Sequence, residues 1–281
     1  MDIKCLAFDI DGTLTTDKKI IDPRTKKSIE EAMDRGIHIV ISSGRNKESC
    51  EFVYKPLGLE KGNHFLSLVN GQQIYDFQKN QFYNDRLLSI DECKEIQRVC
   101  QKYRCIGRFS KDNHAYYMVP FTYIVRLGIQ KAFKNNTMMK GTKYKNQIVF
   151  YNHKFNETIN KVIFMKSKEF FEKNLSVLKE ELKDFDLMMV DDNWMEIMPK
   201  GVNKASSLKK IASMNGFGME NIMAFGDADN DIDMLKAAGI GVCMGNGRDS
   251  VKAIADIITD SNNDNGIGKV IDKYVLEKNE W

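Results

Sequence analysis

The chain has 281 residues, of which 42% are hydrophobic and 29% charged, with a formal net charge of +3. This composition is typical of a globular protein and excludes a disordered or fibrous chain. The small net charge, without a basic stripe interleaved with aromatic residues, gives no indication of a nucleic-acid partner. The length suits either one large α/β domain or an average domain with a second module attached, and we expect two modules.

The beginning of the sequence enters an apolar strand pattern directly, without the charged leader and apolar core of a signal peptide. No apolar run reaches membrane length. We therefore expect a cytoplasmic protein without a membrane partner, present as a monomer or weak homo-oligomer. The six cysteines form no CxxC pair and lie near no histidine at metal-ligand spacing, so they should be reduced and buried. Any chemistry is expected to depend on carboxylates.

Apolar strands alternate with helices in the first part of the chain. Cys5 to Phe8 reads as a short buried strand. Asp22 and Pro23 supply an N-cap and a first-turn proline for a helix that stops at Gly36. The next apolar run, residues 37–42, is a second buried strand that leads into the polar loop "SSGR".

The same layout returns late in the chain. The segment "NIMAFGDADNDIDMLKAAG", which begins at Asn221, predicts a strand, an acidic loop and a helix ended by Gly239. Such alternation favours an α/β fold with a doubly wound, mainly parallel, Rossmann-like sheet covered on both faces. Ligands of such sheets bind beyond the carboxyl ends of the strands, so the polar loops should converge there.

The middle of the chain differs from both ends. A helix pattern, "SIDECKEIQRVCQKY", is followed by the strand-like runs "HAYYMV" and "NQIVFYN", another helix, and "FDLMMVDD". This block predicts an inserted α+β cap domain over residues 83–190, between two parts of a core domain, 1–82 and 191–281.

Two acids, Asp9 and Asp11, follow the first strand in "DIDGT". This sequence also suits an ordinary turn. In an extended segment, however, residues two apart point the same way, so both carboxylates would share a small volume and repel each other unless a cation were bound. The loop "GDADND" adds Asp227, Asp229 and Asp231. Oxygen ligands without cysteine or histidine favour Mg²⁺, and neither loop has the spacing of an EF-hand.

Four segments carry a family resemblance. "FDIDGTLT", "SSGR", the lysine of "PKGVNKASSL" and "GDADND" resemble, in order and separation, the four motifs of the haloacid dehalogenase (HAD) superfamily. "GVNKASSL" with "MGNG" downstream is similar to the Cof-type phosphatases of that superfamily. The chain departs from many relatives at Ser42, which stands where they have alanine or another small residue.

The resemblance implies roles for individual residues. Asp9 would be the nucleophile that forms an aspartyl-phosphate, and Asp11 the general acid and base. Mg²⁺ would be held by Asp9, Asp227 and the backbone carbonyl of Asp11. Asp231 would orient its neighbours, while Asp229 would be a solvated loop acid. The phosphoryl oxygens would be held by the Ser43 hydroxyl, the Gly44 amide, the Lys204 ammonium and the Asn230 amide.

The expected activity is that of a magnesium-dependent phosphatase acting on a small phosphorylated metabolite. Sugar phosphates are favoured, and pyridoxal phosphate or a flavin phosphate would also fit. A sugar phosphomutase of the same superfamily shares the aspartyl-phosphate, and the motifs do not distinguish the two. A phosphate-binding sensor without turnover is the alternative from another class. The substrate itself is not encoded in the motifs, because the cap would supply the specificity contacts.

One further segment, residues 113–156, contains no Asp or Glu but seven Lys and Arg residues. This one-sign run could be a solvated basic face. The alternative is that part of it, around "KGTKYKN", attracts an anionic substrate when the cap closes.

Overall fold

The computed structural model describes residues 2–111, 114–120, 123 and 145–277. The chain divides into two compact units: Met1–Asp85 with Val202–Trp281, and Arg86–Gly201. Most cations of the acid-free segment, Lys140 and Lys143 among them, lie outside the described residues, as does the side chain of Lys145.

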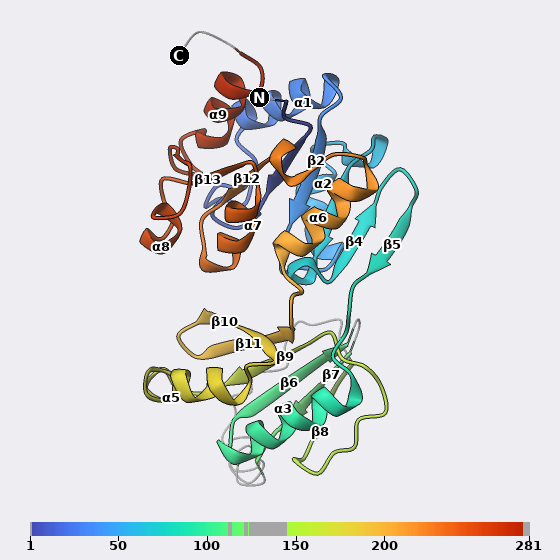
Figure 1. Cartoon of the computed structure of the whole chain (residues 1–281), viewed down its shortest axis with the longest axis vertical. Coiled ribbons are helices and arrows are strands. Elements are labelled where there is room, and N and C mark those ends of the chain that lie inside the picture. Colours follow the sequence, from blue (N-terminus) through green and yellow to red (C-terminus); the bar gives the residue numbers. More distant parts are fainter. Residues whose placement is uncertain (1, 112–113, 121–122, 124–144, 278–281) are drawn as a thin grey trace. The chain divides into compact units, whose positions relative to one another are not determined.

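The first unit contains an eight-stranded sheet in the order β14-β13-β12-β1-β2-β3-β4-β5 (Figure 1). Neighbouring strands are parallel from β14 to β3, whereas β4 and β5 are antiparallel additions at one edge. The predicted mainly parallel sheet is therefore confirmed. The strands are β1 Cys5–Phe8, β2 His38–Ser42, β3 Phe65–Leu68, β4 Gln73–Asp76, β5 Gln81–Asn84, β12 Ile222–Gly226, β13 Ile240–Cys243 and β14 Ile257–Ile258.

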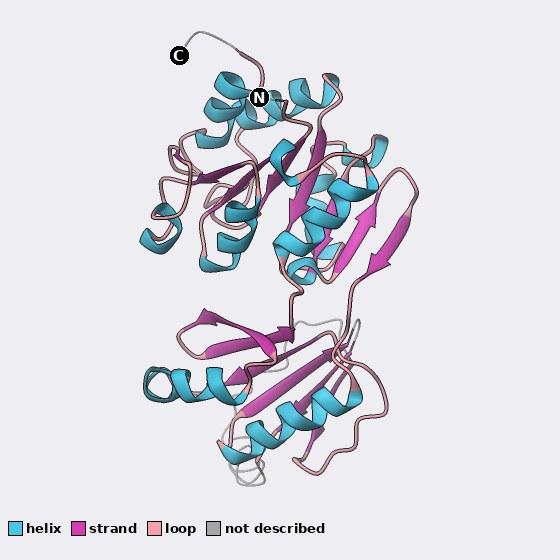
Figure 2. Ribbon diagram, viewed as in Figure 1, coloured by secondary structure: helices cyan, strands magenta, loops and turns pink. Residues whose placement is uncertain are grey.

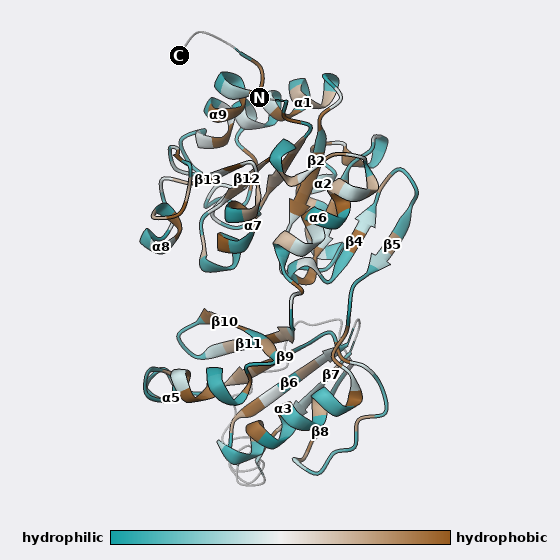
Figure 3. Ribbon diagram, viewed as in Figure 1, coloured by the Kyte–Doolittle hydropathy of each residue, from teal (hydrophilic) through white to brown (hydrophobic). Residues whose placement is uncertain are grey.

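Helices cover both faces of this sheet (Figure 2). Alternate residues of β1 point to opposite sides: Leu6 and Phe8 join one apolar cluster with α1 and α9, and Cys5 and Ala7 join another with α6 and α7. This two-sided burial explains the continuous apolar character of β1 and β2, the latter visible in Figure 3. The helices are α1 Pro23–Asp34, α2 Glu51–Tyr54, α6 Lys204–Met214, α7 Ile232–Ala237, α8 Asp249–Lys252 and α9 Gly266–Tyr274.

Helix α1 illustrates how the local sequence sets the helix ends. The Asp22 side chain accepts a hydrogen bond from the Arg24 amide, and Pro23 occupies the first turn. Gly36 follows the helix with φ of +82°, a left-handed conformation that suits glycine. Both ends lie where the sequence predicted them.

The second unit is an antiparallel sheet with one parallel pair, ordered β10-β11-β9-β6-β7-β8. Helices α3 and α5 contribute to one apolar cluster with Phe109 and Phe164 of the sheet. This is the predicted α+β fold. The elements are α3 Ile90–Lys102, β6 Ile106–Lys111, β7 His114–Met118, β8 Lys145–Val149, β9 Lys161–Met165, α5 Lys168–Glu181, β10 Phe185–Asp191 and β11 Trp194–Pro199.

The boundaries between the units differ from the sequence prediction. The first lies after Asp85 rather than after residue 82, and the second lies after Gly201 rather than after residue 190. The larger difference arises because β11 pairs with β10 and β9 and so belongs to the second sheet.

All six cysteines are buried and free, as the sequence predicted. Within the described parts of the chain, no helix combines the length and the apolar composition needed to cross a membrane.

A buried aromatic pair joins the two strands that lead to the polar loops. Phe8 of β1 and Phe225 of β12 are fully buried and stack with their ring centroids 5.0 Å apart. We expect Phe225→Ala to lower the free energy of unfolding by about 3–5 kcal/mol, because it removes a buried ring and leaves a cavity. Phe82→Ala is the matched control, since Phe82 is 45% exposed, and should cost less than half as much. Equal losses in urea unfolding would contradict this prediction.

Candidate active site

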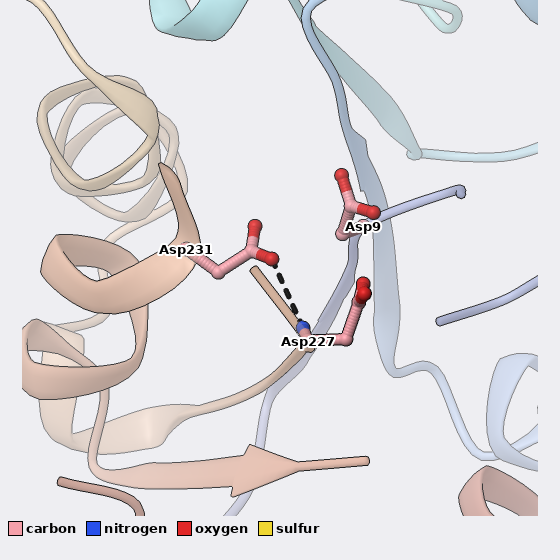
Figure 4. A group of neighbouring side chains, drawn as sticks. All are labelled: Asp9, Asp227 and Asp231. Atoms are coloured by element: carbon pink, nitrogen blue, oxygen red, sulfur yellow. Dashed lines mark hydrogen bonds between the residues drawn. The ribbon is translucent and has the colours of Figure 1, made fainter. Parts of the chain in front are cut away.

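Three carboxylates gather at the carboxyl end of the parallel sheet. Asp9 directly follows β1 and Asp227 directly follows β12, and these strands are parallel neighbours with Phe8 opposite Phe225. The Asp9 amide donates to the Phe225 carbonyl at 3.0 Å, which fixes the two strand ends together. Asp231 lies at the start of α7 and completes a group in which one carboxylate oxygen from each residue lies within 4.8 Å of the other two (Figure 4).

Two glycines allow these acids to approach each other. Gly12 has φ of +82°, and a Cβ atom there would lie 2.5 Å from Oδ2 of Asp227. At Gly226, a Cβ atom would lie 2.5 Å from Cβ of Asp231. A side chain at either position would displace the side chain of Asp227 or Asp231 from the group.

Asp227 accepts a hydrogen bond from the loop that follows β1, and Asp231 accepts two from its own loop. Oδ1 of Asp227 accepts from the Thr13 hydroxyl at 2.7 Å. Oδ2 of Asp231 accepts from the amides of Asp227 and Ala228, at 3.0 and 3.1 Å. The other Asp231 oxygen, Oδ1, is left to accept from Nζ of Lys204. The orienting role of Asp231 stays a prediction, and its carboxylate belongs to the acidic group together with Asp9 and Asp227.

Lys204 is buried among these acids. It is the first residue of α6, which begins after Asn203, and the Asn203 side chain accepts from the Ser206 amide as an N-cap. Nζ of Lys204 donates to Oδ1 of Asp9 at 2.5 Å and to Oδ1 of Asp231 at 2.6 Å. Its side chain is only 1% exposed. Burial alone would lower the pKa of this ammonium group, but the two carboxylates reverse that effect and raise it.

The electrostatics of the acidic group suit a hard cation. Burial raises the pKa of Asp9 to about 7, with Asp231 and Asp227 acting in the same direction and Lys204 opposing them. Burial also raises the pKa of Asp227. Three carboxylates with one ammonium leave an excess of negative charge when all are ionised. Their oxygen atoms are the ligand type that Mg²⁺ prefers, so the residues present fit such an ion.

The structure corrects the expectation that the Asp9 and Asp11 carboxylates share one volume. The Asp11 carboxylate instead accepts from Nη2 of Arg45 at 2.7 Å and from Nζ of Lys19 at 2.8 Å. The chain turns directly after β1, with the Leu14 amide donating to the Asp9 carbonyl at 3.1 Å, so the alternation of an extended strand ends there. Burial acts to raise the pKa of Asp11, but hydrogen bonds from Lys19 and Arg45 outweigh it and the pKa is lowered. A metal contact from the Asp11 carbonyl stays a prediction.

The predicted phosphate-binding residues lie on the loops after neighbouring strands. Ser43 follows β2, is 3% exposed, and donates its amide hydrogen to the Ser67 carbonyl at 2.8 Å. Gly44 comes next, and a Cβ atom there would lie 3.1 Å from Oδ1 of Asn70. Asn230 is half-buried between Asp229 and Asp231. Their roles stay predictions.

Asn70 lies beside the predicted phosphate loop, although none of the four sequence motifs pointed to it. This residue is 6% exposed, has φ of +55°, and donates its amide hydrogen to the Ser43 carbonyl at 3.0 Å. Its side chain therefore lies against the predicted phosphate loop. The signal was present in "VNG", because Asn-Gly marks a tight turn at the end of a strand.

Side-chain hydrogen bonds show what two other residues, Asp229 and Ser42, contact in the folded chain. Asp229, expected to be a solvated loop acid, is exposed but accepts from Arg248 at 2.5 Å and from Ser250 at 2.6 Å. It thus ties the acidic loop to the start of α8. Ser42, the departure from many relatives, bonds through its hydroxyl to Ser67, which is bonded in turn to Ser207 of α6.

Comparisons with known proteins agree with this geometry. The family model of the haloacid dehalogenase-like hydrolases matches residues 6–271. A 5-amino-6-(5-phospho-D-ribitylamino)uracil phosphatase of Bacillus subtilis is 32% identical over 276 residues, 98% of this chain and 97% of that protein. The chain belongs to the haloacid dehalogenase-like hydrolases.

Two further proteins match nearly the whole length of this hydrolase. A pyridoxal phosphate phosphatase of Escherichia coli is 25% identical over 98% of this chain and 100% of its own length. A phosphatase structure of this superfamily from Bacteroides thetaiotaomicron shares the fold, with a TM-score of 0.76 and 21% identity over 96% of this chain and 94% of its own. The chain is thus a phosphoric monoester hydrolase of the HAD superfamily.

The raised pKa of Asp9 predicts a pH-dependent stability of the metal-free hydrolase. Between its ordinary pKa of 3.8 and about 7, the folded chain keeps a proton that the unfolded chain has lost. In a chelator, the free energy of unfolding should therefore fall as the pH rises through this window. Asp9→Asn should reduce the decrease in the free energy of unfolding with pH. A smaller decrease should remain, because the pKa of Asp227 is also raised. Urea unfolding across the pH range measures this, and identical slopes in both proteins would contradict it.

Proposed function

We propose that this hydrolase removes phosphate from small phosphorylated metabolites by way of an aspartyl-phosphate on Asp9, with Mg²⁺ as the cofactor. The contact between buried Lys204 and Asp9, beside Asp227 and Asp231, carries the proposal. It combines a carboxylate that could act as the nucleophile, a fixed positive charge, and carboxylate oxygens that could bind a metal ion. Phosphoryl transfer requires these three components.

Asp9 would attack phosphorus as the ionised carboxylate. The alkoxide of the substrate would leave, and water would then cleave the aspartyl-phosphate to restore the carboxylate. Burial raises the pKa of Asp9 and so favours its protonated form. A positive charge close to the carboxylate opposes this effect and favours the ionised form that attacks phosphorus. Lys204 supplies such a charge within the chain. Mg²⁺, held by Asp9, Asp227 and the carbonyl of Asp11, would neutralise charge on the phosphoryl group.

Asp11 would act as the general acid that protonates the leaving oxygen and then as the base that activates water. In the present arrangement Arg45 and Lys19 favour its ionised form. Acid catalysis therefore requires these ion pairs to open and the carboxylate to take up a proton when substrate binds. Both cations are partly exposed, so the pairs cost little to break.

The phosphoryl oxygens would be held by donors from three loops. These are the hydroxyl of Ser43, the amide of Gly44, the ammonium of Lys204 and the side-chain amide of Asn230. Backbone and side-chain donors that are fixed before the reaction lower the barrier, because they need no reorganisation as charge moves.

The names of the relatives support a proposal for the substrate class. The Bacillus relative is named for a phosphorylated ribityl compound and the Escherichia relative for pyridoxal phosphate. Both are phosphate esters of small metabolites, and we favour phosphorylated sugars or sugar alcohols for this chain. The unit Arg86–Gly201 would serve as the cap that contacts the rest of the substrate.

The nucleophile assignment is tested with Asp9→Asn. The amide cannot form the covalent intermediate, so phosphate release from phosphorylated sugars should fall at least about a thousandfold, with little loss of folded structure. Asp34→Asn, at an exposed position outside the site, is the control and should be fully active. Substantial turnover by the purified Asp9 variant would refute the assignment. Isomeric sugar phosphates among the products of the parent protein would indicate a mutase instead of a phosphatase.

The metal assignment is tested by cation removal and by Asp227→Ala. Activity should disappear in a chelator and return with Mg²⁺. The variant should lose about a hundredfold or more in kcat/KM, because a ligand and its charge are removed. Asp34→Ala should behave as the parent protein. Full activity in the chelator would show that no dissociable cation is required.

A further inference from the structure

The second unit contains a groove of its own, lined only by residues of that unit. It has a volume of about 620 Å³ and lies between α3 and the loop that follows β8. Helix α3 contributes Lys94, Gln97 and Arg98 to its lining, and the loop contributes Tyr151, Lys154 and Phe155.

The shape of the groove is fixed by hydrogen bonds and ring contacts. The Gln97 side chain, 8% exposed, donates to the carbonyl of Tyr151 and, at 2.9 Å, to that of His153. The His153 ring packs edge-on against Phe155, with centroids 4.9 Å apart. The Tyr151 hydroxyl donates to the Cys105 carbonyl at 2.7 Å. The loop is thus held against α3 by contacts within the protein, and the groove does not depend on a ligand for its form.

The charged groups of the groove are of one sign. Lys94, Arg98 and Lys154 are exposed, and no acidic side chain is among the residues that line it. Lys94 and Arg98 lie one helical turn apart on the same face of α3. The ion pair of Lys94 with Asp91, at 2.8 Å, is solvent-exposed and therefore weak. Lys154 belongs to the acid-free segment 113–156, so that feature of the sequence contributes directly to this surface.

Beside the cations the groove has apolar walls. Phe155 is 5% exposed and Ile90 is half-buried, and both line it together with Tyr151. An apolar wall next to a positive charge strengthens the attraction of an anion, because water screens the charge from fewer directions. It also favours a ligand with a flat apolar part.

We propose that this groove is a second anion-binding site, which takes a small molecule with a phosphate-type head and a flat apolar group. The head would contact Arg98 and Lys154, and the apolar group would lie against Phe155 and Ile90. The site belongs to a different unit from Asp9, and the proposal does not rest on the proposed catalytic function.

Binding is tested with phenylphosphonate, which has this chemistry and is not a phosphate ester. Proton NMR of the four histidine rings at pH 8 reports the location of binding, with His153 assigned from His153→Gln. Burial lowers the pKa of His153, so its ring is neutral at this pH. We expect a saturable shift of the His153 signal in the parent protein. Methylphosphonate, which lacks the ring, should bind the groove more weakly.

The double variant Arg98→Ser/Lys154→Ser should raise the phenylphosphonate concentration at half-saturation about tenfold or more, since hydrogen bonds to charged groups are lost. The matched control is Lys173→Ser/Lys179→Ser, which removes the same charge from exposed positions of α5 outside the groove. It should bind as the parent protein does. A His153 shift that does not saturate, or one weakened equally by both double variants, would overturn the proposal.

Discussion

The contact of Lys204 with Asp9 and Asp231 is the interaction on which the site depends. A lysine that is 1% exposed is stable only if its charge is compensated, and removing one partner of such a buried pair typically costs about 3–5 kcal/mol. The two carboxylates need the lysine for the same reason, because without it they would repel each other in a buried volume. The side chains of Lys204, Asp9 and Asp231 can therefore be charged together only when folding brings β1, α6 and the acidic loop into contact.

Much of this arrangement could be predicted from the sequence. The apolar strands before Asp9 and Asp227, and the rule that parallel strands present their carboxyl ends together, were sufficient to bring these residues into one site. Lys204 was found by its motif and by the helix that follows it. For the two aspartates a local strand pattern coincides with a simple rule of sheet geometry, whereas for Lys204 the motif was sufficient.

Other features depend on contacts that a local pattern does not contain. The turn after Asp9 directs Asp11 toward Arg45, a residue 34 positions away. The boundary predicted after residue 190 falls inside the hairpin formed by β10 and β11, whose turn is the polar pair Asp192 and Asn193. A polar turn and a polar linker have similar sequences, and only the pairing of the strands distinguishes them.

The position of β1 in the middle of its sheet has a consequence for the synthesis of the protein. One neighbour, β2, is encoded nearby, but the other, β12, begins at Ile222. Until the ribosome has made that segment, the nascent chain holds an apolar strand with one side unpaired, a state prone to association with other chains. Residues 86–201 can form their own core during this interval. The first unit is thus completed last, when the segment from Val202 onward closes the open side of its first strand.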